Sequence, residues 1–261
     1  MAWRAPQYAY LHAARDVGVA SITPNASFTA GDEKYLIDDR CHDAESVFAW
    51  SDSAANHTID IDLGSDYVTG LDRLYVPNHD ITSTWTLTED TASDFSADPQ
   101  VRGGGSFVAG TDFDGPIATP TEDRYLRLTI ISSGAWSLGQ LWLSTTVTTT
   151  AGPEQGWTDE LYPNVTQLPS GDSIQDDVDQ AFYEFTYPAA GAAAAADKTA
   201  LEALVAAVST YRPFLLDPPY DTEAVKVMKL TERARVRVNT LVPASGTPTA
   251  EIRLSMLEYL G

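Results

Sequence analysis

Alternation of apolar and polar residues dominates the first half of the chain. In Ile59-Asp-Ile-Asp-Leu63 and Arg124-Tyr-Leu-Arg-Leu128 every second residue is apolar, so each strand is expected to bury one face and expose the other. Turn-forming residues such as Pro77-Asn-His-Asp80 and Gly103-Gly-Gly105 separate these segments. We predict strands at 58–63, 71–76, 84–88, 106–108, 124–131 and 139–146. Short strands with regular turns predict a β-sandwich or jelly roll.

The pattern changes near residue 150. Residues 148–180 are rich in Thr, Pro and Asp, and we predict a linker and extended arm there. The aromatic run 182–187 predicts a strand. Further strands are predicted at 224–230, 233–241 and 250–259.

One helix is predicted, over residues 199–211. Leu201, Leu204, Val205 and Val208 recur at i, i+3, i+4 and i+7 and predict one buried stripe. Thr199-Ala-Leu-Glu202 has the form of a capping box, and Pro213 is expected to stop the helix. The predicted fold class is therefore mainly β: an N-terminal jelly-roll β-sandwich and a C-terminal β-sandwich or α+β domain with one packed helix.

Four segments follow from these patterns. We predict an N-terminal arm at 1–20, a β-sandwich at 21–147, the linker at 148–180 and a second β domain at 181–261.

The composition is strongly acidic. The 261 residues carry a formal net charge of −21, with a pI of about 4.3, which disfavours nucleic acid and anionic membranes as partners. Cys41 is the only cysteine, so an internal disulfide is excluded. The N-terminus shows no apolar signal core and no apolar run is long enough to span a bilayer, so we expect a protein made in the cytoplasm, without membrane insertion or a cleaved signal.

Residues 35–143 resemble the galactose-binding-like β-sandwich of the discoidin (coagulation factor 5/8 type C) family. Modules of this family usually bind a ligand and seldom catalyse a reaction. The resemblance is carried, in order, by Leu36-Ile-Asp-Asp39, Phe48-Ala-Trp-Ser51, Asp60-Ile-Asp-Leu-Gly64, Val68–Val76, Arg124–Leu128 and Leu138–Leu143.

The same resemblance implies candidate site residues. Family members often hold a structural calcium ion, and here Asp38, Asp39 and Asp43 are the candidate ligands. The late acidic position of the family is occupied by the neutral Gln140, and an acidic surface loop is the alternative interpretation. No cofactor other than calcium is indicated. We expect Trp50, Trp85 and Trp142 in the core, and Trp136, beside Gly134-Ala135 in a predicted loop, as the candidate for glycan recognition.

The second domain resembles the tail-tube and distal-tail family of tailed bacterial and archaeal viruses, whose copies pair into rings. The resemblance is carried by Phe182–Tyr187, Leu201–Val208, Arg212–Asp217 and Ile252–Glu258. Arg233, Arg235 and Arg237 form a one-sided basic stripe on a predicted strand. The stripe is either a subunit interface or one side of cross-strand pairs with Glu223 or Glu251, and both interpretations stay open.

Residues suited to catalysis do not converge in the sequence. The four histidines are scattered, and Asp60 and Asp62 share one strand face that we interpret as solvated rather than as an acid/base pair. We therefore expect no enzyme. The chain is expected to be a structural protein of a virus tail, a distal-tail, baseplate or minor tail component in a homo-oligomeric ring. Its partners would be other tail proteins and a host-surface glycan. The alternative is a carbohydrate-binding module of a non-viral polysaccharide system.

Overall fold

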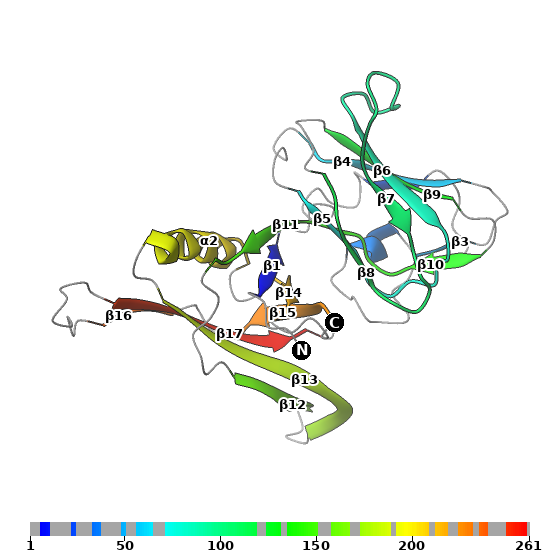
Figure 1. The fold of residues 1–261 in the computed structure, drawn as a ribbon. Coiled ribbons are helices and arrows are strands. Elements are labelled where there is room, and N and C mark those ends of the chain that lie inside the picture. The colour runs from blue at the N-terminus through cyan, green and yellow to red at the C-terminus, as the bar shows by residue number, and fades with distance from the viewer. Residues whose placement is uncertain are drawn as a thin grey trace. The chain divides into compact units, whose positions relative to one another are not determined.

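The computed structural model is mainly β and forms two compact units (Figure 1). Residues 1–10 and 147–260 make up one, here called the helical unit, and residues 11–146 make up the other, here called the sandwich unit. The structure describes residues 6–10, 22–24, 33–37, 48–50, 56–64, 71–118, 124–131, 135–150, 158–167, 173–188, 192–208, 212–218, 224–231, 235–239 and 249–259. Among them there is no helix with both the length and the apolar character that spanning a membrane requires.

The sandwich unit contains antiparallel sheets. One sheet has five strands in the order β2-β4-β9-β6-β7, β5 pairs with both β8 and β11, and β10 pairs with β3. The strands are β2 (Ile22–Pro24), β3 (Phe48–Trp50), β4 (His57–Asp62), β5 (Arg73–Val76), β6 (Thr84–Asp90), β7 (Gln100–Ser106), β8 (Phe113–Pro116), β9 (Tyr125–Ile131), β10 (Trp136–Leu138) and β11 (Trp142–Thr148). A 3-10 turn, η2, spans Glu33–Leu36.

The alternation of the sequence produces the core of this unit. Ile59 and Ile61 of β4 and Leu128 of β9 are fully buried, and they share one core cluster with Leu74 of β5. Because one cluster takes residues from both sheets, the sheets face each other as a sandwich. Each buried Leu or Ile contributes about 1.5–3 kcal/mol relative to an exposed one.

The opposite face of β4 carries ion pairs instead of an acid/base pair. Asp60 lies across from Arg127 in the register and accepts two hydrogen bonds from its guanidinium, at 2.6 and 2.7 Å. Asp62 is paired in the same way with Arg124, at 2.5 Å for both bonds. Each carboxylate has its own arginine.

The glycine triplet lies in a strand, although the sequence predicted a turn there. Gly103 and Gly105 of β7 lie against the indole of Trp85 on β6. A Cβ atom on Gly103 would lie 2.9 Å from Ile117 Cγ2 and 3.1 Å from Trp85 Cη2. The glycines are therefore needed for close packing, a role that glycine also has within strands.

The helical unit combines a sheet with one helix. The strand order is β12-β13-β17-β15-β14-β1, and β16 also pairs with β17. All of these pairings are antiparallel. The elements are β1 (Gln7–Tyr10), β12 (Thr158–Gln167), β13 (Ser173–Pro188), α2 (Ala192–Val208), β14 (Phe214–Asp217), β15 (Lys226–Leu230), β16 (Arg235–Asn239) and β17 (Thr249–Glu258).

This sheet bends so that β1 and β13 approach each other, and the helix packs against both. Tyr8 of β1 and Tyr187 of β13 are separated by three strands in the sheet order, yet their phenolic oxygens lie 2.6 Å apart. Helix α2 contacts both β1 and β13. Tyr183 and Phe185 of the aromatic strand are buried beside Leu201 of the helix, which closes the core of the unit.

The helix is longer at its start than the sequence predicted. It begins at Ala192, so Thr199 lies inside the helix and the predicted capping box is wrong. Alanine has the highest helix propensity, and the run of alanines before residue 197 extends the helix accordingly. The predicted stripe is confirmed, because Leu201, Leu204 and Val208 are buried and Val205 is partly buried against the same core.

Two segments contain strands that the sequence did not predict as part of the second domain. Within the predicted arm 1–20, β1 pairs with β14 in the helical unit. Within the predicted linker 148–180, β12 pairs with β13, which continues beside β17. The β1–β14 and β13–β17 pairings join residues far apart in the chain, so no local pattern predicts them. Strands β12 and β13 form a hairpin and are neighbours in the sequence.

Candidate functional site

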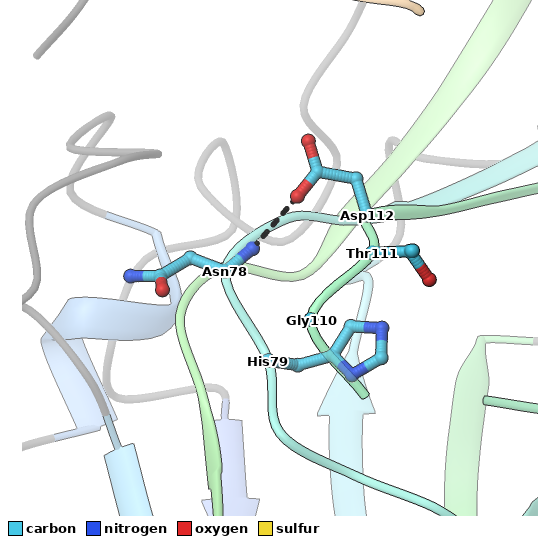
Figure 2. A pocket seen from close by; sticks show the side chains of 5 residues that line it. All are labelled: Asn78, His79, Gly110, Thr111 and Asp112. Carbon is cyan, nitrogen blue, oxygen red and sulfur yellow. Dashed lines mark hydrogen bonds between the residues drawn. The ribbon is translucent and has the colours of Figure 1, made fainter. Parts of the chain in front are cut away.

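A polar hollow of about 210 Å³ lies in the sandwich unit (Figure 2). Asn78 and His79 reach it from the β5–β6 connection, and Gly110, Thr111 and Asp112 reach it from the β7–β8 connection. Binding residues are often found on loops held by a rigid scaffold, and both connections follow directly from paired strands.

Unusual backbone conformations shape the hollow. Asn78 has φ 51° and Gly110 has φ 74°, a left-handed region that asparagine and glycine tolerate. Gly139 donates its N–H to the carbonyl of Asn78 at 2.9 Å, and a Cβ atom at Gly139 would lie 2.9 Å from that carbonyl oxygen. Gly110 donates to the carbonyl of His79 at 3.3 Å. The backbone of the β5–β6 connection is thus held by hydrogen bonds from two segments, one at Gly139 and the other at Gly110.

Asp112 is held in place from two sides. Its Oδ1 accepts the N–H of Asn78 at 3.0 Å, and its Oδ2 accepts the hydroxyl of the fully buried Tyr75 at 2.7 Å. The residue as a whole is exposed. Among the residues that the structure describes, no cationic side chain pairs with it. A carboxylate oxygen has more than one lone pair, so both oxygens can still accept hydrogen bonds from a ligand.

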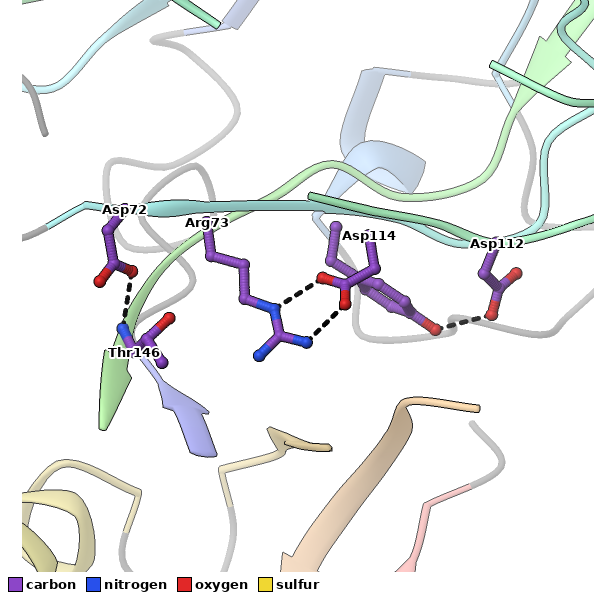
Figure 3. Close-up of polar contacts among 6 residues, drawn as sticks. Asp72, Arg73, Asp112, Asp114 and Thr146 are labelled. Carbon is purple, nitrogen blue, oxygen red and sulfur yellow. Dashed lines mark hydrogen bonds and ion pairs between the residues drawn. The ribbon is translucent and has the colours of Figure 1, made fainter. Parts of the chain in front are cut away.

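Other carboxylates near Asp112 have partners of their own (Figure 3). Arg73 of β5 donates to both oxygens of Asp114 on β8, each at 2.6 Å. Asp72 accepts the N–H of Thr146 at 2.8 Å. Arg73 is already neutralised by Asp114, so it does not compensate the charge of Asp112.

His79 is the second polar group of the hollow. It is 5% exposed, and neither ring nitrogen has a hydrogen-bond partner in the described part of the chain. Its ring packs on Phe107, with centroids 5.0 Å apart, and Phe107 in turn stacks on Trp85. Burial lowers the pKa of His79, and the charges of Asp112 and Asp80 oppose that shift only in part. The imidazole is therefore neutral at neutral pH and offers one donor and one acceptor.

The arrangement is suited to binding. A neutral imidazole, an oriented carboxylate and a threonine hydroxyl line one small space. Thr111 donates its hydroxyl to the carbonyl of Val108 at 2.8 Å and keeps its own oxygen as an acceptor. No three His, Cys, Asp or Glu side chains are grouped to hold a metal ion anywhere in the described residues.

The predicted calcium ligands are not tested. Asp38, Asp39 and Asp43 lie outside the described residues, and the calcium site stays a prediction. Gln140, at the position where the resemblance implied an acid, is buried and accepts the indole N–H of Trp142 at 2.5 Å. The amide oxygen of Gln140 therefore provides the hydrogen-bond acceptor for the buried indole N–H of Trp142.

The placement of Trp136 in an exposed loop is wrong. Trp136 begins β10, is 3% exposed and contacts His57 edge-on at 5.2 Å between ring centroids. The strand is three residues long, too short to show a period in the sequence. The core positions of Trp85 and Trp142 are confirmed. The side chain of Trp50 is not among those that the structure describes, so its core position stays a prediction.

The arginine stripe is described in part. Arg235 and Arg237 lie in β16, opposite Arg253 and Glu251 of β17, and Arg233 lies outside the described residues. Glu251, one of the two cross-strand partners considered from the sequence, therefore lies opposite Arg237. A subunit interface at this strand stays a prediction.

The sequence did not single out His79, Asn78 or Asp112 as site residues. Pro77-Asn-His-Asp80 was interpreted only as turn chemistry. The one available signal was a histidine inside a turn, which does not reveal that residues 110–112 lie beside it.

No protein-family model matches this chain, and no curated protein matches it. Solved structures are similar over about half of the chain. CBM32-3 from a family 31 glycoside hydrolase of Clostridium perfringens is 12% identical, with 52% of this chain and 94% of that chain covered and a TM-score of 0.38.

Two further solved structures show the same extent of similarity. A family GH29 fucosidase of Ruminococcus gnavus in complex with fucose is 15% identical over 52% of this chain, with a TM-score of 0.39, but only 27% of the fucosidase chain is covered. A Clostridium perfringens CBM32-5 in complex with GalNAc-β-1,3-galactose is 13% identical over 47% of this chain and 94% of that chain, with a TM-score of 0.36. No residue of the hollow is assigned from these structures.

Proposed function

We propose that the sandwich unit is a non-catalytic carbohydrate-binding module and that the polar hollow is its binding site. His79 carries this proposal, because it is a buried imidazole whose two nitrogens have no partner among the described residues. Buried polar groups nearly always have hydrogen-bond partners. The nitrogens of His79 are themselves buried, so a ligand reaches them when the ring turns toward the hollow, and the exposed Asp112 is the residue that meets the ligand first. The proposal coincides with the alternative function expected from the sequence.

The chemistry of the hollow matches vicinal hydroxyl groups. A hydroxyl both donates and accepts a hydrogen bond, and the neutral imidazole of His79 and the carboxylate of Asp112 complement those two capacities. Pockets for drug-sized ligands measure about 300–1,000 Å³, so the smaller hollow suits a single sugar ring.

The experiment is a titration of the full chain with a panel of mono- and oligosaccharides, followed by the imidazole NMR signals of the histidines. Binding at the hollow is expected to shift the signals of His79, while His57, fully buried in the core, serves as the internal control. His79→Ala is expected to abolish binding. Saturable binding that leaves the His79 signals unmoved, or no binding across the panel, would refute the proposal.

A second candidate function concerns the helical unit. We propose that it assembles copies of the chain into a ring in the tail of a virion made in the host cytoplasm, with other tail proteins as partners. The hairpin of β12 and β13 favours this function. Residues 182–188 of β13 pair with β17, whereas residues 173–180 have only β12 beside them in the described part of the sheet. An isolated two-stranded hairpin is marginally stable, so a neighbouring copy is expected to support it.

Light scattering on the full chain tests this second function. A stable oligomer is expected for the natural chain, and a monomer after residues 164–178 are replaced by a two-residue turn. A natural chain that stays monomeric at high concentration would exclude the ring.

A further inference from the structure

We propose that the hollow selects a sugar residue with a free, protonated amino group over the N-acetylated form of the same sugar. This inference rests on the proposed carbohydrate-binding function and specifies its ligand class. The observation that supports it is that one hollow is lined both by Asp112, whose carboxylate has no cationic partner among the described residues, and by the neutral imidazole of His79. Figure 2 shows both side chains in this lining.

The hydrogen-bond capacity of the lining is mostly that of an acceptor. Asp112 uses one lone pair of each oxygen for Asn78 and Tyr75 and can accept more. The Thr111 hydroxyl spends its proton on the carbonyl of Val108 and is left as an acceptor. His79 supplies a single N–H. A ligand group that donates several hydrogen bonds is therefore favoured, and an ammonium group has three N–H donors.

The charge of the hollow favours the same ligand. Asp112 is an exposed carboxylate, and Asp80 next to His79 is a second one, whose Oδ1 accepts the N–H of Ser137 at 2.5 Å. The nearby Arg73 is neutralised by Asp114. Hydrogen bonds between charged partners are roughly twice as strong as those between neutral ones. The net charge of −21 also raises the local concentration of cationic ligands.

The N-acetylated form lacks both advantages. Its amide nitrogen has one N–H and no charge, and the acetyl group needs additional room in a hollow of about 210 Å³. A preference of about tenfold for the amine follows from replacing a neutral hydrogen bond by a charge-assisted one.

The experiment compares the methyl glycosides of glucosamine and galactosamine with their N-acetylated counterparts. Each is titrated into the full chain by calorimetry, with the His79 NMR signals reporting the place of binding. Below the pKa of the sugar amine, the amino sugars are expected to bind about tenfold more tightly. Above that pKa the preference is expected to disappear, a readout that needs no variant.

Asp112→Asn tests the residue itself. The asparagine can accept the Asn78 N–H with its oxygen and donate to the Tyr75 oxygen, so the loop is retained. The ratio of the two affinities is expected to fall to about one. Asp94→Asn is the matched control, because Asp94 is exposed and also accepts one backbone N–H and one hydroxyl, both from Ser96. Asp94 follows the end of β6, whereas the hollow lies before its start. The Asp94→Asn variant is therefore expected to keep the preference for the amine.

The outcomes separate this inference from the proposed function. Equal or tighter binding of the N-acetylated sugars at His79 would overturn the amine preference and leave the carbohydrate-binding function standing. A preference that survives in Asp112→Asn would also overturn the inference. Absence of binding by every sugar, charged or neutral, would end both.

Discussion

Removing the charge of Glu89 tests how the five-stranded sheet is held together. Glu89 of β6 forms an ion pair with Arg102 of β7, and their side chains are 0% and 15% exposed. Arg102 is the extra residue of a β-bulge, because Leu87 faces Gly103 while Thr88 faces Val101. A bulge redirects a side chain, and here it brings the guanidinium to the buried carboxylate.

The expected cost follows from this burial. Breaking a buried ion pair by removing one partner costs about 3–5 kcal/mol, because a charge stays behind without compensation. Glu89→Gln keeps the shape and one acceptor oxygen, so we expect the lower end, about 3 kcal/mol. With a urea dependence of about 1–3 kcal/mol per M, the midpoint should fall by roughly 1–3 M.

Urea unfolding followed by tryptophan fluorescence is a suitable assay. Trp50, Trp85, Trp136 and Trp142 belong to the sandwich unit, so they report mainly on its unfolding. The control is Asp62→Asn, which breaks an ion pair whose side chains are 30% and 49% exposed. Solvent screens such a pair, and its loss is expected to change the midpoint little. Equal midpoint changes for Glu89→Gln and Asp62→Asn would refute the argument from burial.

Three further predictions concern other parts of the fold. Burial raises the pKa of Asp90, but the backbone N–H groups of Ala92, Asp98 and Ala97 and the Thr91 hydroxyl outweigh it and lower the pKa overall. Its contribution is therefore complete above the unfolded pKa and is lost as the pH falls through the folded pKa. Asp90→Asn should weaken the acid dependence of the melting temperature, and an unchanged dependence would contradict this. Gly103→Ala should destabilise the sandwich unit by about 1–3 kcal/mol through overpacking against Ile117 and Trp85, as measured by urea unfolding; an unchanged free energy of unfolding would show that these side chains shift to make room. Tyr8→Phe removes a buried 2.6 Å hydrogen bond to Tyr187 and should cost the helical unit roughly 1 kcal/mol in thermal unfolding; no change would mean that this bond contributes nothing.

The sequence was sufficient for elements whose signal is local. The alternation in β4 and β9 predicted their buried faces, and the spacing of Leu201, Leu204 and Val208 predicted the buried stripe of α2. In both cases the spacing of apolar residues within one segment reveals the buried face, so the prediction does not require knowing which segment packs against it.

Only the tertiary structure decided what depends on distant partners. It paired β1 with β14, buried Trp136 beside His57 and placed Gly103 against Trp85. It also brought His79 and Asp112 to one hollow, although the connections that carry them are separated by the two strands β6 and β7. These contacts arise from register and packing between segments far apart in sequence, and a local pattern contains no information about which segment will lie opposite.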